Sequence, residues 1–168
     1  MSKFTPYPIG NAYKVKTNVT AGSATSNTAD TLLNSVLVPA NTFAAGDVVM
    51  MEAMVSKSAS LGTYIVRFYW NTTNSLSGAI LIGTGASNGT NVRSQVMTRQ
   101  GLIRTVNGSG TGTLVANSST AINADNIVTA APSTLAINWT VDGYFIVSAS
   151  HTSASETVTG EWLKISTY

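Results

Sequence analysis

The residues that could perform catalysis are few in this sequence. His151 is the single histidine; it ends an apolar run beside Thr152 and Ser153, which predicts a solvent-facing side chain rather than a general base. The chain has no cysteine, and its seven acids show no metal-ligand spacing. Glu156 and Glu161, five residues apart, would suit a weak calcium site, but a solvated rim is the better interpretation. We therefore expect a protein that is not an enzyme and that holds no cofactor or metal.

Two further patterns bear on phosphate or nucleic-acid binding. The glycine-rich stretch 108–112 lacks the Lys-Ser/Thr pair of a P-loop, so it predicts a hairpin tip. Arg93, Arg99 and Arg104 fall close together around a predicted hairpin with its bend at 100–101. Because exposed aromatic residues are not interleaved with these arginines, they are better interpreted as charges that protect an edge strand. With a net charge of only +2, no nucleic-acid partner is expected.

The composition indicates which elements must position these residues. Of 168 residues, 43% are hydrophobic and only 10% are charged, against about 25% charged in an average soluble domain. Serine and threonine, with 20 and 24 residues, supply the polarity instead, and they suit pleated, half-buried surfaces. No apolar run reaches the about 18 residues of a membrane span, and no signal-peptide pattern opens the chain. We expect an all-β, soluble, cytosolically made protein with no membrane partner.

Short apolar runs separated by turn residues continue from Leu32 onward, which is typical of an antiparallel β-sandwich. The dipeptide Asp142-Gly143 is the strongest hairpin signal, because a two-residue type I′ turn needs φ > 0 at both positions. It predicts that the strand ending at Val141 pairs with the strand starting at Tyr144. The predicted strands are 32–38, 47–56, 63–71, 79–83, 92–98, 102–107, 112–116, 134–141, 144–151 and 157–166.

Two of these strands, 47–56 and 63–71, are apolar on both faces. In 63–71 the second face carries Ile65, Arg67 and Tyr69, opposite a fully apolar first face. A strand covered on one side only would show a polar second face. The second faces are therefore predicted to be buried by another subunit, with Ile65, Arg67 and Tyr69 at the interface. The alternative is a loop of the same chain folded over the sheet.

The first 30 residues differ from the rest and are interpreted as an extended N-terminal arm, 1–30, ahead of a sandwich domain, 31–168. Much of the arm is Thr, Ser, Ala, Asn and Gly, which bury little surface, with one short strand within 13–20. A frayed terminus and an arm that orders against a partner both fit this composition. For the second interpretation, the anchoring residues are Lys3, Lys14 and Lys16, with the terminal aromatics Tyr7, Tyr13 and Tyr168.

Six stretches of the domain 31–168 together form a pattern of strands and turns: 32–43, 45–49, 63–71, 135–139, 142–147 and 161–165. In this pattern the domain resembles the TNF-like jelly-roll domains of bacteriophage virion proteins, which form head fibres, capsid decoration proteins and tail-fibre tips. The resemblance implies a jelly-roll topology, a homotrimer, and an N-terminal arm that attaches the trimer to the particle. It brings no catalytic residues.

Two functions of different classes follow from these observations. The first is a non-enzymatic virion structural protein, a trimer that decorates or stabilises the capsid or tail and contacts other virion proteins through residues 1–30. It would be made in the host cytoplasm and located in the virion. The alternative is a receptor- or glycan-binding module of a tail fibre or baseplate, because loops rich in Asn, Ser, Thr and Tyr suit sugar hydroxyls.

Overall fold

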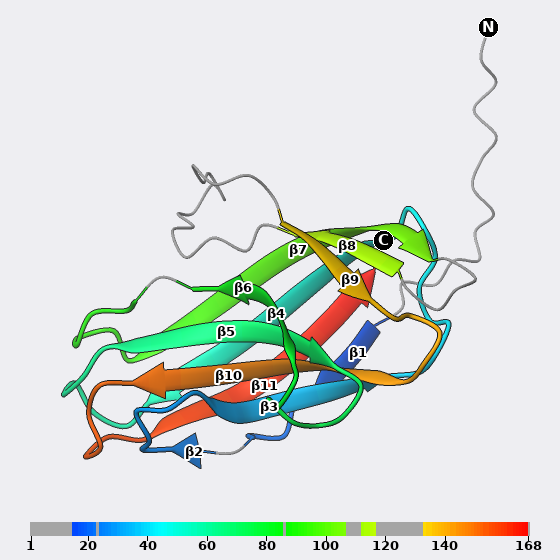
Figure 1. Cartoon of the computed structure of the whole chain (residues 1–168). Helices are drawn as coiled ribbons and strands as arrows, with labels where there is room; N and C mark the ends of the chain where they lie inside the picture. The colour runs from blue at the N-terminus through cyan, green and yellow to red at the C-terminus, as the bar shows by residue number, and fades with distance from the viewer. Residues whose placement is uncertain (1–14, 23, 86, 107–111, 117–132, 168) are drawn as a thin grey trace, which may run out of the picture.

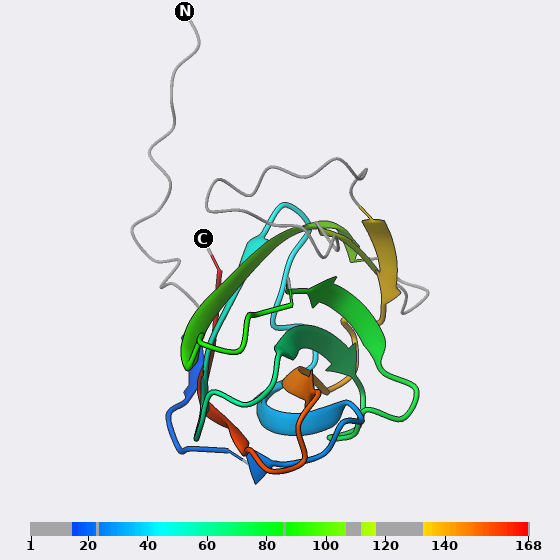
Figure 2. The same cartoon turned by 90° about the vertical axis from the view of Figure 1, so that its left-hand side faces the viewer.

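The computed structural model describes residues 15–22, 24–85, 87–106, 112–116 and 133–167. These residues form eleven β-strands and no helix. The strands make two antiparallel sheets that pack face to face, as the end-on view of Figure 2 shows. The predicted all-β sandwich is therefore confirmed.

The larger sheet has seven strands and lies behind the smaller one in Figure 1. Its order along the sheet is β1 (Val15–Asn18), β11 (Val158–Thr167), β4 (Val48–Lys57), β7 (Ser94–Val106), β8 (Gly112–Ala116) and β9 (Ser133–Ile137), while β2 (Ala24–Thr25) also pairs with β11. The smaller sheet has four strands in the order β3 (Thr31–Val38), β10 (Gly143–His151), β5 (Tyr64–Asn71) and β6 (Ile80–Thr84).

The core lies between the two sheets, and strict alternation along the strands builds it. Successive side chains of a strand point to opposite faces, so the odd positions of β4 and the even positions of β5 face inward. At one end of the core, the ring of Trp70 lies 4.8 Å from Trp139 and 5.0 Å from Phe145, and Phe43 packs edge-on against Trp139 at 5.2 Å. The inward residues of β4 and β5 are Val49, Met51, Ala53, Val55, Tyr64, Val66, Phe68 and Trp70, all buried.

The predicted hairpin at Asp142-Gly143 is wrong. The strand before it, β9, pairs with β8 in the larger sheet, whereas β10 pairs with β3 and β5 in the smaller one. The chain crosses between sheets at this point because Trp139 is buried among the core aromatics. Asp142 accepts a hydrogen bond from the amide of Ala40 at 2.8 Å. Gly143 is required for another reason: a Cβ there would lie 2.2 Å from the Trp70 ring.

The predicted bend at 100–101 is also wrong, because β7 runs through it as one strand. Gly101 pairs with Val49 of β4 on one side and with Ala116 of β8 on the other. It is buried within the larger sheet, so this glycine lies inside a strand rather than at a turn.

Residues 15–30 lie along the side of the sandwich where β11 and β3 meet. The short strand predicted within 13–20 is present as β1, which pairs antiparallel with the end of β11. The Asn18 amide donates to Asn34 Oδ1 at 2.7 Å, and Gly22 N–H donates to the Gly160 carbonyl at 2.7 Å. This part of the predicted arm is therefore tied to both sheets.

Candidate functional site

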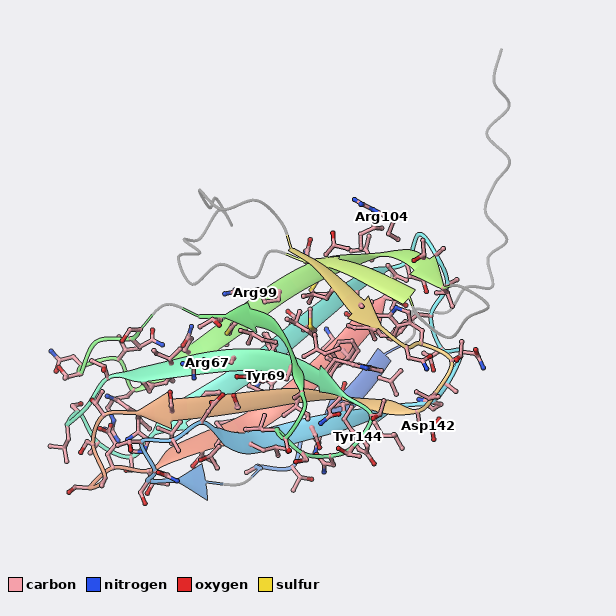
Figure 3. The ribbon with its side chains drawn as sticks, viewed as in Figure 1. Arg67, Tyr69, Arg99, Arg104, Asp142 and Tyr144 are labelled. Carbon is pink, nitrogen blue, oxygen red and sulfur yellow. The ribbon has the colours of Figure 1, made fainter. Side chains whose placement is uncertain are left out.

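The three sandwich residues predicted at an interface lie together on the outward face of β5. Ile65, Arg67 and Tyr69 are each half-buried and alternate with the inward residues of the strand. Figure 3 shows Arg67 and Tyr69 along this strand, with Tyr144 at the start of the neighbouring strand β10. The structure therefore brings these residues to one surface, the outer face of the smaller sheet.

Asp30 connects this surface to the segment that precedes β3. Its carboxylate accepts hydrogen bonds from Tyr69 Oη at 2.7 Å, from Ser148 Oγ at 2.8 Å and from Arg67 Nη1 at 3.2 Å. Arg67 Nη1 also donates to Ser150 Oγ at 3.0 Å. The polar groups of Arg67 and Tyr69 are thus bonded within their own chain, which is what the alternative of a covering segment predicts.

The electrostatics of the Asp30 network keep Tyr69 as a neutral donor. Burial raises the pKa of the Tyr69 phenol to about 12, and the hydrogen bond to Asp30 and the negative charge of that carboxylate act in the same direction. The positive charge of Arg67 opposes this shift only in part. The phenol therefore donates to Asp30 at any physiological pH.

Of the other predicted anchoring residues, the structure describes Lys16 alone. Lys16 lies in β1, opposite Ile165 of β11. Lys3, Tyr7, Tyr13, Lys14 and Tyr168 lie outside the described residues.

A second surface that carries apolar side chains is the outer face of the larger sheet. The register aligns Trp162, Met54 and Val96 in one row across β11, β4 and β7, and it places Val48 opposite Leu102 in another. Val96 is 56% exposed and Leu102 41%. Among the described residues, Val96 lies where β7 pairs with β4 only, whereas Leu102 also pairs with β8. We call this surface the outer apolar face; its apolar residues are Val48, Met50, Met54, Val96, Leu102 and Trp162.

Polar residues interrupt the outer apolar face in two rows. In the first, Lys164 Nζ lies 3.0 Å from Glu52 Oε2, and Thr98 continues the row on β7. In the second, Met50 lies between Ser166 and Gln100. The ion pair is partly exposed, so it contributes little to stability, on the order of 1 kcal/mol or less. Arg104 lies at the margin of the face and points away from the sandwich (Figure 3). The face therefore combines apolar and polar rows, and its Glu52–Lys164 pair of charges is self-compensated.

An ion pair is fully buried at the end of the sandwich where β4 ends and β5 begins. Lys57 Nζ lies 3.1 Å from Glu156 Oε1, and neither side chain is exposed. The ammonium also donates to the carbonyls of Gly62 at 2.6 Å and Thr90 at 2.7 Å. Glu156 Oε2 accepts the amides of Gly62 at 2.6 Å and Leu61 at 3.2 Å. The pair therefore ties three connections together.

The prediction of a solvated rim at Glu156 is consequently wrong. Burial by itself would raise the pKa of this carboxyl, but the hydrogen bond from Lys57, the amide of Gly62 and the charge of Lys57 together lower it. The alternation of inward and outward residues along β4 could have predicted the burial of Lys57. This lysine is the next inward position after Val55, and it lies one residue beyond the predicted strand end at Ser56. Because both groups are paired and enclosed, the arrangement is structural rather than reactive.

Two other charged or titratable residues predicted at the surface are buried. His151 is 3% exposed, because the last residue of β10 faces inward opposite Tyr64. Arg99 is 5% exposed, and it donates to the carbonyls of Thr84 and Thr98. Burial lowers the pKa of the Arg99 guanidinium to about 10. The prediction of a surface charge is therefore wrong for Arg99, whereas Arg93 and Arg104 are exposed.

In the part of the chain that the structure describes, no group of three His, Asp or Glu side chains could hold a metal ion. The described residues also contain no helix of the length and apolarity that crossing a membrane requires. Comparisons with family models, with curated proteins and with solved structures find no match for this chain.

Proposed function

We propose that the protein is a non-enzymatic structural subunit of a bacteriophage virion, a homotrimer of jelly-roll domains that decorates or stabilises the capsid or tail surface. The observation that carries the self-association is the outer apolar face. Contiguous exposed apolar patches on soluble proteins mark interaction sites, and most oligomers are assembled from copies of one chain. The phage assignment rests on the resemblance of the domain 31–168 to TNF-like virion proteins.

The proposed interface, the outer apolar face of the larger sheet, differs from the one predicted from the sequence, which was the outer face of β5. Arg67 and Tyr69 on the smaller sheet are bonded to Asp30 within one chain, so they offer a second subunit few free groups. Val96 and Leu102 on the larger sheet are exposed and apolar. Covering side chains of this kind removes apolar area from water, which stabilises a complex by roughly 25 cal/mol per Å² before the costs of association.

The strand pairing supports a jelly-roll topology for the proposed subunit. With β2 and the pair β8 and β9 set aside, two four-stranded sheets remain, in the orders β1-β11-β4-β7 and β3-β10-β5-β6. Among these eight strands, the first pairs with the last, the second with the seventh, the third with the sixth and the fourth with the fifth. A long hairpin rolled up in this way is the plan of an eight-stranded jelly roll.

The position of β1 supports an attachment role for the residues before it. Val15, the first described residue, pairs with Ser166 at the edge of the larger sheet. Residues 15–30 bond to both sheets, which leaves 1–14 as the part of the arm that contacts other virion proteins in this proposal.

Sedimentation equilibrium of the full chain at micromolar concentration tests the proposal. The expected mass is three times the chain mass of 17.5 kDa. Val96→Lys, in the middle of the outer apolar face, is expected to give monomers, because a charge would be buried without a partner. Leu37→Lys is the matched control, since Leu37 is 45% exposed on the outer face of the smaller sheet.

Two results would overturn the self-association: a monomeric wild-type chain, or a trimer that Val96→Lys and Leu37→Lys leave equally intact. A trimer that is lost in both variants would place the contact elsewhere and refute the choice of face. The virion assignment is tested separately, by locating the protein in purified particles with electron microscopy and an antibody against the chain; its absence from every particle would refute it.

A further inference from the structure

A hollow of about 340 Å³ lies on the outer face of the smaller sheet, at the end where β5 begins and β10 ends. We infer that this hollow is a binding site for a neutral saccharide of one or two rings. Its volume is at the lower end of the range of about 300–1,000 Å³ that small-molecule sites occupy. The lining residues are Thr28, Thr63, Ile65, Ser150, His151 and Thr152.

The two central strands of the sheet form the floor of the hollow. Ser150 of β10 lies directly opposite Ile65 of β5, and both face outward. One step further along, the amide of Thr63 donates to Thr152 Oγ1 at 3.0 Å, and the amide of Thr152 donates to the Thr63 carbonyl at 3.0 Å. These bonds, one between backbone groups and one from backbone to side chain, hold residues 63 and 152 together past the ends of the two strands.

The hydroxyls around the hollow match the chemistry of a sugar. Each Ser or Thr hydroxyl is both a donor and an acceptor, as each sugar hydroxyl is. Ser150 Oγ accepts from Arg67 Nη1, which leaves its own hydrogen for a ligand. Thr63 is half-buried and Thr152 is exposed; their hydroxyl oxygens lie 3.4 Å apart, so they share one hydrogen bond and keep part of their capacity for a ligand. Thr28, which is exposed, adds a third threonine from the segment before Asp30. Ile65 supplies an apolar contact for the C–H face of a ring.

The charges beside the hollow favour a neutral ligand. The nearest cation in the hydrogen-bond network, Arg67, is 3.2 Å from the Asp30 carboxylate and shares its Nη1 with Ser150. Because Arg67 and Asp30 neutralise each other, the carboxylate of a sugar acid would find no unpaired cation in this network to bind. A neutral hexose or N-acetylhexosamine needs only the hydroxyls and the apolar floor.

The hollow and the outer apolar face lie on opposite sheets. Ile65 and Ser150 belong to the smaller sheet, whereas Val96 belongs to the larger one. Saccharide binding is therefore independent of the proposed self-association, and each can fail in experiment without the other.

The test is a titration of the isotope-labelled full chain, followed by amide chemical shifts, with free glucose, galactose, mannose, N-acetylglucosamine and N-acetylgalactosamine. The ligand efficiency of small molecules predicts a Kd on the order of 1 mM for a single ring. At least one sugar is expected to give saturable shifts at 63–65 and 150–152. N-acetylneuraminic acid serves as the anionic comparison and is expected to bind at least tenfold more weakly.

Three variants separate the hollow from other surfaces. Ile65→Trp fills the space and is expected to abolish the shifts, while Thr28→Val removes one hydroxyl at constant shape and should weaken binding at least threefold. Thr98→Val, on the outer face of the larger sheet, is the matched control and should change nothing. The inference is overturned if no neutral sugar gives saturable shifts, if only the anionic sugar binds, or if binding survives in Ile65→Trp with an otherwise unchanged amide spectrum.

Discussion

Glu156→Gln is the substitution whose effect the structure defines most closely. The change keeps the size of the side chain and removes its charge, so it leaves the Lys57 ammonium fully buried without an anionic partner, beside the carbonyls of Gly62 and Thr90. The change also replaces one carboxylate oxygen, an acceptor, with an N–H₂ group, which is a donor. In one orientation of the new amide this group faces Lys57, and in the other it faces the backbone amides of Leu61 and Gly62, so two donors meet in either case.

The expected cost is large because the partner charge stays behind. Breaking a buried ion pair by removing one member costs about 3–5 kcal/mol. For a domain of this length each kcal/mol shifts Tm by about 2–4 °C, so a decrease of roughly 6–20 °C is expected. Glu52→Gln is the matched control: its partner Lys164 is 40% exposed, so the loss is expected to be at most about 1 kcal/mol.

Urea unfolding followed by tryptophan fluorescence measures both variants, at one fixed protomer concentration because association would also stabilise the folded state. A double variant, Lys57→Met with Glu156→Leu, removes both charges and is expected to regain most of the lost stability. The reasoning is refuted if Glu156→Gln costs no more than Glu52→Gln, or if the double variant is as unstable as the single one.

The same pair predicts a dependence on pH. The pKa of Glu156 is lower in the folded chain than in the unfolded one, so its ionisation stabilises the fold above the unfolded value of about 4.3. This stabilisation is lost as the pH falls through the folded pKa. The difference in unfolding free energy between the wild type and Glu156→Gln should therefore be constant near neutral pH and shrink below about pH 4.3. A difference that grows on acidification would contradict the assignment.

Two further substitutions test the packing of the core. Gly143→Ala places a Cβ 2.2 Å from the Trp70 ring and should cost about 1–3 kcal/mol in urea unfolding, whereas Gly89→Ala, with nothing within 4 Å, should cost nothing; equal stability of the two variants would contradict the crowding. Tyr64→Phe removes a buried hydroxyl that has no hydrogen-bond partner among the described residues, and whose pKa burial and the charge of Glu156 raise to about 12. The variant should be as stable as the wild type or up to about 1 kcal/mol more stable, and a clear loss would show that the hydroxyl is bonded.

The faces of the long strands were predictable because burial follows a period of two. Val49, Met51, Ala53 and Val55 are fully buried, and this series follows directly from the alternation. The same rule finds Lys57 and Arg99 on inward positions once the strands are given their full lengths. Both were missed because each lies one position beyond a predicted strand end, at Ser56 and at Thr98.

Sheet membership and the polar network were not predictable, since they depend on contacts far apart in the chain. Asp142-Gly143 has the local chemistry of a hairpin, but burial of Trp139 takes the chain to the other sheet instead. Asp30 meets Arg67, Tyr69 and Ser148, which lie 37, 39 and 118 positions away. No local pattern encodes such separations.

The pairing of β1 with β11 sets the order in which the chain can fold during its synthesis. Val15 finds Ser166, and β3 finds β10, only after almost all of the described chain has been made. At about 5–20 residues per second, the ribosome needs roughly 10–30 s to reach that point. Until then neither sheet has its full set of strands, and pairings this distant also form slowly. Newly made chains should therefore depend on chaperones or rapid completion to avoid aggregating through unpaired strand edges.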